Sequence, residues 1–494
     1  MSMSADTPSF RRPFEREIAE GAASFPLTAG VANRGASDGF QGVRTLIWVY
    51  FWLLMFEGVL RKWIFPEFAN QLLVVRDPVL LLCYFLALKK RAFPRTIFMV
   101  LIVVLGLVAT LFSGIGISTG ETRCTLVVLL YGLRAAFGHL PMIFLIGRVF
   151  GRREVERVGR WLLVMALPMA LLVYLQYQAG TSGWVNAGAG LDSEQAGVAV
   201  YGIEKIRPPG IFSFNTGLTA FVGLVSAYLV AHFLSGGKLY WRWLGILASC
   251  AVVACVPLSV SRSTVGGLVV IGVAAVLCVS RSTELFTRGF RILLLIGVAI
   301  AIVGSFSFFR EGLGILQDRF KEGEGIKVGV FERLAKTFTR PMEILSSTPF
   351  LGAGLGVGTN VGSKLITGTS GFLLSEGDWE RDIDEMGPLV GLFYIFLRVG
   401  IAGYMVSVGW KSLKRGSTLS ILLAGAGGLS VLNGNFAQPT SLGFAVFTGG
   451  LCLAAAKNSE IENLQPPSPE RILNTRIRGR SVYAEQLHGS PPKG

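Results

Sequence analysis

The chain carries few charged residues. Asp, Glu, Lys and Arg make up only 16% of its 494 residues, while 51% are hydrophobic and the mean hydropathy is +0.56. Soluble proteins carry about 25% charged residues, so this composition excludes a string of soluble domains. Apolar runs of about 18–22 residues recur instead, which is the length needed to cross about 30 Å of hydrocarbon. We therefore expect an all-α fold, a polytopic transmembrane helical bundle of about 12 spans.

Histidine and cysteine are also scarce. The six cysteines, all in or beside apolar runs, and the three histidines are Cys83, Cys124, Cys250, Cys255, Cys278, Cys452, His139, His232 and His488. Their spacing matches neither a disulfide framework nor a metal site. We therefore expect no metal and no cofactor, and we interpret the cysteines as small core residues.

Three further signals are missing. Residues 1–42 lack the basic start and apolar core of a cleaved signal peptide, so we expect a cytoplasmic tail there. The Gly-rich stretch Thr348–Gly358 lacks the Gly-Lys-Ser/Thr ending of a nucleotide-binding loop, and close backbone packing is its expected role. The net charge of +15 comes without a basic patch interleaved with aromatic residues, so we exclude nucleic acid as a partner.

The pattern of apolar runs predicts five parts. They are the N-terminal tail at 1–42, a bundle of about nine spans at 43–309, a long polar loop at 310–387, three last spans at 388–456, and a C-terminal tail at 457–494. The long loop is the only extended polar segment between hydrophobic runs. We therefore expect it to form the extracytoplasmic part of a functional site.

Basic residues indicate the orientation. They gather in segments that would lie on one side of the membrane, namely Lys89–Arg95, Gly151–Arg160, Ser235–Arg242, Ser280–Arg291 and Lys411–Ser417. By the positive-inside rule this side is cytoplasmic. Both termini are then cytoplasmic, and the loops at 178–210 and 310–387 lie on the outer face of the bilayer.

A few charges fall inside the predicted spans. Arg76 and Asp77 are adjacent in the second span, where they either neutralise each other in part or lie in the membrane interface. Arg134 and His139 lie in the fourth span, and Arg398 lies in the tenth.

Arginines stand at two entrances to the bundle on the predicted outer side. Arg207 precedes a rigid Pro-Pro-Gly turn and Asn215 at the start of the sixth span, a pattern that an interfacial anchor and a helix start would also explain. Arg262 lies between two apolar spans with almost no loop, where an arginine is costly unless it pairs or faces water. The planar guanidinium matches phosphate oxygens, so we interpret Arg207 and Arg262 as candidates for binding an anionic substrate, and Asn215 as a substrate-binding candidate beside them.

The long loop contains two further candidate regions. Phe331–Ser347 has helical periodicity, so it is either an amphipathic helix on the membrane surface or a helix whose Arg333 and Arg340 also meet the substrate. The acidic stretch Ser375–Gly387 is either a solvated helix end or a catalytic segment.

In the catalytic interpretation of that acidic stretch, Glu376 or Glu380 is the general base. Arg381 and Glu385 then help to position the substrate.

Four motifs, taken in order, resemble the bacterial O-antigen ligase and polysaccharide polymerase superfamily. They are Arg-Pro-x-Gly-x-Phe-x-x-Asn at Arg207–Asn215, Ser-Arg-Ser at Ser261–Ser263, Glu-Arg at 332–333 followed by Pro-Phe-Leu-Gly-x-Gly-Leu-Gly at Pro349–Gly356, and Glu-x-Gly-x-x-x-Gly at Glu385–Gly391. The resemblance implies an inner-membrane enzyme that uses undecaprenyl-pyrophosphate-linked glycans at the periplasmic face without a metal. It also implies that Arg207, Arg262 and Arg333 hold the pyrophosphate.

One departure from the family pattern directs the functional prediction. The ligases carry a histidine in the long loop as the proposed base, whereas the histidines of this chain lie outside that loop and Glu376 stands near the expected place. We therefore favour a polymerase-like glycosyltransferase with a carboxylate base, acting beside other polysaccharide assembly proteins. A ligase for a lipid or protein acceptor, a transporter of lipid-linked oligosaccharides and a non-catalytic assembly factor remain as alternatives.

Overall fold

The computed structural model describes residues 39–179, 183–187, 206–237, 239–325, 339–369, 371, 373–375 and 377–464. The regular elements in these ranges are helical, as expected. The longer helices are α3 (Gln41–Val59), α4 (Asp77–Lys89), α5 (Ile97–Thr119), α8 (Arg152–Ala179), α10 (Asn215–Leu234), α12 (Arg262–Val279), α13 (Thr283–Gly304), α14 (Ser307–Gly325), α17 (Asp378–Lys414) and α19 (Pro439–Leu464). The shorter helices are α6 (Leu126–Leu133), α7 (Pro141–Val149), α11 (Arg242–Leu258), α16 (Asn360–Thr367) and α18 (Leu419–Asn433).

Short turns of other helix types join these elements. Two are π-helical, η1 (Leu60–Ile64) and η4 (Arg134–Gly138). Three are 3₁₀ turns, η2 (Pro66–Phe68), η3 (Gln71–Val74) and η5 (Trp184–Asn186).

The number of membrane-crossing helices is lower than expected. In the described ranges, 9 helical segments are long and apolar enough to cross a bilayer, or up to 10 if the bent pair of α6–η4 and α7 counts as one span. The predicted seventh and eleventh spans correspond to α11 and α18, which are apolar but have only 17 and 15 residues. The chain is thus a polytopic helical membrane protein, and twelve spans are not confirmed.

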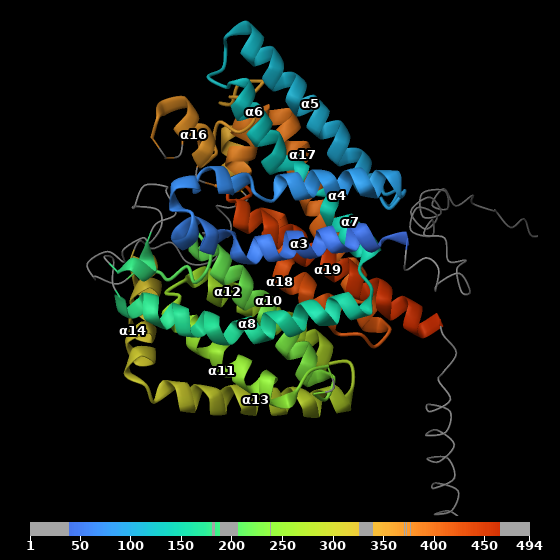
Figure 1. The fold of residues 1–494 in the computed structure, drawn as a ribbon, viewed down its shortest axis with the longest axis vertical. Coiled ribbons are helices and arrows are strands. Elements are labelled where there is room, and N and C mark those ends of the chain that lie inside the picture. The colour runs from blue at the N-terminus through green and yellow to red at the C-terminus, as the bar shows by residue number, and fades with distance from the viewer. Residues whose placement is uncertain are drawn as a thin grey trace, which may run out of the picture.

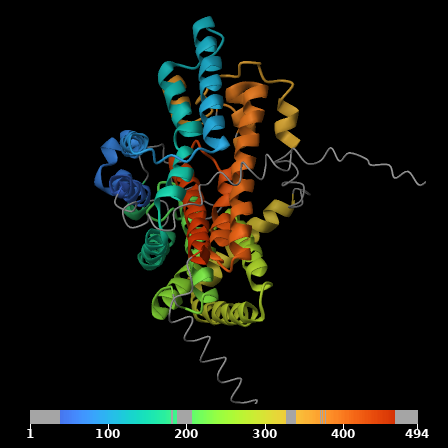
Figure 2. The same cartoon turned by 90° about the vertical axis from the view of Figure 1, so that its right-hand side faces the viewer.

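Burial separates a central set of helices from a peripheral one. α10 and α19 are largely buried, whereas few residues of α5, α12 and α13 are buried inside the protein. Phe286 and Leu293 of α13, for example, are 66% and 68% exposed. In a bilayer such side chains meet lipid rather than water, so their exposure carries no hydrophobic cost. Figure 2 shows α3 and α8 nearly end-on while α5 and α17 run lengthwise, so the helices cross at large angles.

The described chain begins and ends on the same side of the bundle. Figure 1 shows the start of α3 and the end of α19 at the right. Arg44 of α3 pairs with Glu154 of α8 at 3.4 Å, and Lys457 of α19 donates to the Phe150 carbonyl at 3.1 Å. We call this side the tail end. The opposite side, where η1 lies and where α10, α12, α17 and α19 begin, is the loop end.

Basic segments meet at the tail end. Arg148 donates to the carbonyl of Phe93 at 3.0 Å, and Arg288 donates to that of Leu234 at 2.7 Å. This grouping is what the charge pattern predicts for one side of the membrane. Which membrane side the tail end faces stays a prediction, as do the predicted domain boundaries.

The backbone of α17 breaks at Gly387, and the Gly-rich segment Pro349–Gly358 covers the break. Pro388 has no N–H, so the carbonyl of Asp384 loses its helical partner. The N–H of Ala353 replaces it at 2.7 Å, and the N–H of Gly354 donates to the Glu385 carbonyl at 3.1 Å. The segment therefore satisfies carbonyls that the break leaves without helical donors, which agrees with the backbone-packing role expected for it.

Replacing Gly387 with alanine should destabilise the fold. Its φ of 79° and ψ of 165° lie in a region that is nearly specific for glycine and costs other residues about 1–3 kcal/mol. An added Cβ would also lie 2.1 Å from the Phe350 carbonyl oxygen. We expect a lower thermal unfolding midpoint for detergent-purified Gly387→Ala. Gly403→Ala on the same helix is the control, because its Cβ would meet nothing within 4 Å; equal midpoints for the two variants would contradict the assigned role of Gly387.

Candidate functional site

The first part of α17 carries a buried ionic cluster at the loop end. We define the α17 cluster as Asp378, Arg381, Asp382, Glu385 and Arg398. Arg398 is fully buried and contacts both aspartates, with Asp382 at 3.0 Å. Arg381 is paired with Asp378 and lies 3.3 Å from Asp382. Each aspartate thus lies between two guanidinium groups, which offsets the cost of burying its charge.

The third carboxylate of the α17 cluster is held by backbone groups. The N–H groups of Gly356 and Gly358 donate to the two oxygens of Glu385 at 3.0 and 2.9 Å. The guanidinium of Arg381 is farther away, at 3.9 Å. The Gly-rich segment is therefore fixed to α17 by both the backbone and the side chain of Glu385.

A second buried cluster lies where α3 ends. Glu57 is 1% exposed and pairs with Arg61 at 3.7 Å and with Arg76 at 3.0 Å. Arg61 also donates to the Ala69 carbonyl at 2.7 Å and to the Ser213 hydroxyl at 2.7 Å.

Hydrogen bonds extend this cluster through three buried side chains. Arg76 contacts the Tyr50 hydroxyl at 3.4 Å, and this hydroxyl lies 2.9 Å from Nδ1 of His139. Nε2 of His139 lies 3.2 Å from Asp77, whose other oxygen is 2.5 Å from Arg134. We call the whole set the α3 cluster; it consists of Tyr50, Glu57, Arg61, Arg76, Asp77, Arg134 and His139.

The adjacent charges Arg76 and Asp77 have separate partners. Arg76 pairs with Glu57, and Asp77 pairs with Arg134 and His139. Sequence adjacency suggested mutual neutralisation or an interfacial position. The helical backbone instead sends neighbouring side chains in different directions, so each finds its own counter-charge.

One connector, Asn433–Pro439 between α18 and α19, is bound by both clusters. Arg398 donates to the Gly434 carbonyl at 2.8 Å, and Arg381 donates to the Asn435 side chain at 3.1 Å. From the α3 cluster, Arg76 donates to the Pro439 carbonyl at 2.5 Å. The connector therefore joins the two clusters.

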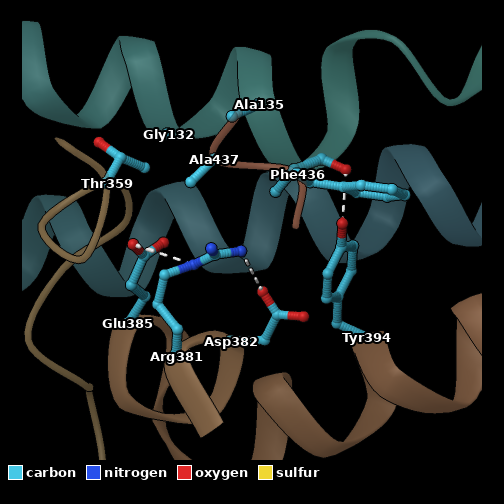
Figure 3. A pocket seen from close by; sticks show the side chains of 10 residues that line it. Gly132, Ala135, Thr359, Arg381, Asp382, Glu385, Tyr394, Phe436 and Ala437 are labelled. Carbon is cyan, nitrogen blue, oxygen red and sulfur yellow. Dashed lines mark hydrogen bonds and ion pairs between the residues drawn. The ribbon is translucent and has the colours of Figure 1, made fainter. Parts of the chain in front are cut away.

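A small pocket lies beside the α17 cluster. Its empty volume is about 230 Å³, including space open to solvent, and its walls come from α6, η4, α17 and the connector. Figure 3 shows Arg381 between Glu385 and Asp382, with Thr359 and Phe436 also at the wall. Tyr394 donates to the Ala136 carbonyl at 2.8 Å and closes one side. The pocket thus lies between two interrupted helices, α6–η4–α7 and α17.

The structure places Arg207, Asn215 and Arg262 in one corner of the loop end. The amide of Asn215 donates to the Pro208 carbonyl at 3.2 Å and to the Ser259 carbonyl at 3.3 Å. Pro208 follows Arg207 in the sequence, and Ser259 stands three residues before Arg262. Both arginines are half-buried, and in the described part of the chain Nε of Arg207 is buried without a hydrogen-bond partner.

The predicted residues of the long loop have different surroundings. Glu380 is half-buried in the first turn of α17, and Arg340 is exposed in the helical turn at 339–344. Glu376 and Arg333 lie outside the described residues. Arg381 and Glu385 are buried and bound within the α17 cluster, so the acidic stretch is largely a buried ionic element rather than a solvated helix end. Roles of all these residues in catalysis or substrate binding stay predictions.

The sequence interpretation named many charges of both clusters but not their pairing. Glu57 was not noted, Asp378 and Asp382 were noted only as part of the acidic stretch, and Arg398 only as a charge within a span. The available signal was the presence of ionisable residues in apolar segments, which are rare and usually paired or functional. Their partners are far away in sequence, so the pairing itself had no local signal.

Two comparisons with known proteins leave the class of this chain to its own fold. Its fold and buried charges define a polytopic helical membrane protein. No protein-family model matches the sequence, and no curated protein is significantly similar to it. In the described residues, no group of three or more His, Cys, Asp or Glu side chains could hold a metal ion.

Replacing Arg398 with methionine should strongly destabilise the protein. The change would leave two buried aspartates with one guanidinium, and breaking a buried ion pair costs about 3–5 kcal/mol. We expect a markedly lower thermal unfolding midpoint, partly restored in Arg398→Met/Asp378→Asn because the double variant removes one negative charge. Lys411→Met, at an exposed position of the same helix, is the matched control. An unchanged midpoint for Arg398→Met would refute the assigned stabilising role.

The reactivity of the Cys124 thiol tests whether the Gly-rich segment covers α17. Its thiol lies 3.6 Å from the Leu355 carbonyl, and burial, followed by the charge of Glu385, raises its pKa to about 11. In a variant that keeps only this cysteine, we expect a maleimide to react at pH 8 about 100-fold more slowly than with a free thiol of pKa about 8.5. The rate should rise toward pH 11 and on denaturation. Fast reaction of the native protein would show that the thiol of Cys124 is accessible, and would contradict its burial by the Gly-rich segment.

Proposed function

We propose that this protein is a polysaccharide polymerase-like glycosyltransferase of the bacterial inner membrane. It joins undecaprenyl-pyrophosphate-linked glycan units at the periplasmic face, where the loop end lies. The observation that carries the proposal is the grouping of Arg207, Asn215 and Arg262 at one corner of that end. The unused Nε donor of Arg207 supports a role in binding an anionic oxygen.

The chemistry is a single displacement at an anomeric carbon. A carboxylate, Glu376 or Glu380, takes the proton from the acceptor hydroxyl. The hydroxyl oxygen forms a bond to the anomeric carbon while the bond from that carbon to the pyrophosphate oxygen breaks. The electron pair leaves with the lipid pyrophosphate, and Arg207 and Arg262 stabilise its developing charge. Arg333, Arg340, Arg381 and Glu385 complete the proposed binding residues.

A transporter of lipid-linked oligosaccharides is the second candidate. The interrupted helices α17 and α6–η4–α7 favour it, since discontinuous helices commonly surround the binding sites of secondary transporters. In that case no glycosidic bond forms. A ligase that uses the same donor with a lipid or protein acceptor is the alternative within the enzyme class.

Reconstitution distinguishes these functions. The full chain in proteoliposomes should lengthen lipid-linked glycans and release undecaprenyl pyrophosphate. We expect Arg207→Ala and Arg262→Ala each to lower this rate at least about 100-fold, because each removes a donor to the leaving group. Arg281→Ala, an exposed arginine near the tail end, should retain the wild-type rate.

The same assay tests the base and the alternatives. Glu376→Gln or Glu380→Gln should lower the rate about 100- to 10,000-fold, the usual contribution of a general base. Full activity of both carboxylate variants would refute the base assignment. Movement of the lipid-linked glycan across the bilayer without bond formation would identify the transporter, and transfer to a separate acceptor would identify the ligase.

A further inference from the structure

The segment at 207–213 carries Arg207 on a turn whose own backbone offers few hydrogen bonds. Pro208 and Pro209 have no N–H, so Gly210 supplies the first backbone donor after Arg207. Gly210 has a φ of 62°, in the left-handed region that favours glycine, and an added Cβ would lie 2.5 Å from Sδ of Met169. The turn is buried at Gly210, so its backbone groups need partners from other parts of the fold.

Gln176 binds both backbone groups of Gly210 through one side-chain amide. The Gly210 N–H donates to Oε1 of Gln176 at 2.8 Å, and Nε2 of Gln176 donates to the Gly210 carbonyl at 3.0 Å. Gln176 is completely buried on α8. This two-point contact holds the peptide groups on both sides of Gly210 against a transmembrane helix.

Lys62 reaches the same carbonyl from η1. Its ammonium donates to the Gly210 carbonyl at 3.0 Å, and the residue is only 3% exposed. The neighbouring Arg61 donates to the Ser213 hydroxyl at 2.7 Å, at the other end of the segment.

The ammonium of Lys62 is buried without a counter-charge. In the described part of the chain no carboxylate pairs with it, and its contacts are the neutral Gly210 carbonyl and the ring of Trp63 at 5.0 Å. Such contacts only partly offset the cost of burying a charge. Ionisable residues inside membrane proteins are rare and mostly functional, so a charge that holds a backbone turn indicates that the position of this turn matters.

We propose that Lys62 and Gln176 are positioning residues that hold Arg207 for the leaving group of the glycosyl transfer. The inference rests on the proposed function, in which Arg207 stabilises the charge that develops on the pyrophosphate. Gly210 is three residues from Arg207, and Asn215 holds the Pro208 carbonyl between them at 3.2 Å. A guanidinium stabilises a transition state when its donors already point at the developing charge, and a misplacement of about 1 Å can cost about 100-fold in rate.

A double-mutant cycle in the proteoliposome assay tests this role. We expect Lys62→Met and Gln176→Leu each to lower kcat about 10- to 100-fold, with an unchanged KM for the acceptor glycan because Arg207 acts on the leaving group. In an Arg207→Ala background each should lower the rate by less than about 2-fold, because both act through Arg207. Lys457→Met is the matched control, since this lysine donates to the Phe150 carbonyl at the tail end, and it should retain the wild-type rate.

Hydrogen exchange examines the turn without requiring activity. In nanodiscs, the peptide that covers 207–213 should exchange faster in Gln176→Leu than in the wild type, because the Gly210 N–H loses its acceptor. Exchange of this peptide should be unchanged in Lys457→Met. Lys62→Met leaves the Gly210 carbonyl bonded to Gln176, so it provides a second variant should Gln176→Leu not fold.

The outcomes separate this role from the proposed function. A wild-type chain that forms no glycosidic bond would refute both. With an active wild type, full activity of Lys62→Met would overturn the positioning role and leave the proposed function standing. A rate loss that is as large in the Arg207→Ala background as in the wild type, or unchanged exchange in Gln176→Leu, would overturn it as well.

Discussion

The structure depends on neutralising charges that are buried inside the bundle. Arg61, Arg76 and Arg398 are completely buried, and an unpaired charge in such a place costs several kcal/mol. Carboxylates and carbonyls from distant parts of the chain meet this requirement. The connector Asn433–Pro439 receives hydrogen bonds from both buried clusters and so ties α17, α18 and α19 to α3 and α4.

Backbone carbonyls inside the bundle need hydrogen-bond donors just as the buried charges need partners. Where helices break, carbonyls lose their helical donors, and within a bilayer no water replaces them. At the break in α17 the donors come from the Gly-rich segment, whose glycines permit an approach that side chains would block. The segment also binds the Glu385 carboxylate through the N–H groups of Gly356 and Gly358. One loop therefore supplies donors to the broken helix and holds a buried carboxylate.

Both buried clusters contain charges that lie at the loop end, and the cost of charge in hydrocarbon explains why they are paired there. Charged side chains are costly in hydrocarbon and are retained where they pair or meet a polar ligand. The segment at 207–213 joins the corner of Arg207, Asn215 and Arg262 to η1, because Lys62 donates to the Gly210 carbonyl and Arg61 donates to the Ser213 hydroxyl. A membrane enzyme that handles an anionic lipid-linked donor needs such a cationic surface at the bilayer interface, and a transporter of the same substrate would need it too.

Composition and the length of apolar runs determined the helical membrane class, because crossing a bilayer requires long apolar helices whatever they pack against. Loose motifs drew attention to Arg207, Asn215 and Arg262, and the fold brings these together. The tertiary structure alone decided that Arg76 and Asp77 have separate partners, that the acidic stretch before Gly387 is buried, and that Arg398 meets Asp378. Ion pairs join residues by their proximity in space, and helix packing brings together charges whose separation along the chain carries no signal of their pairing.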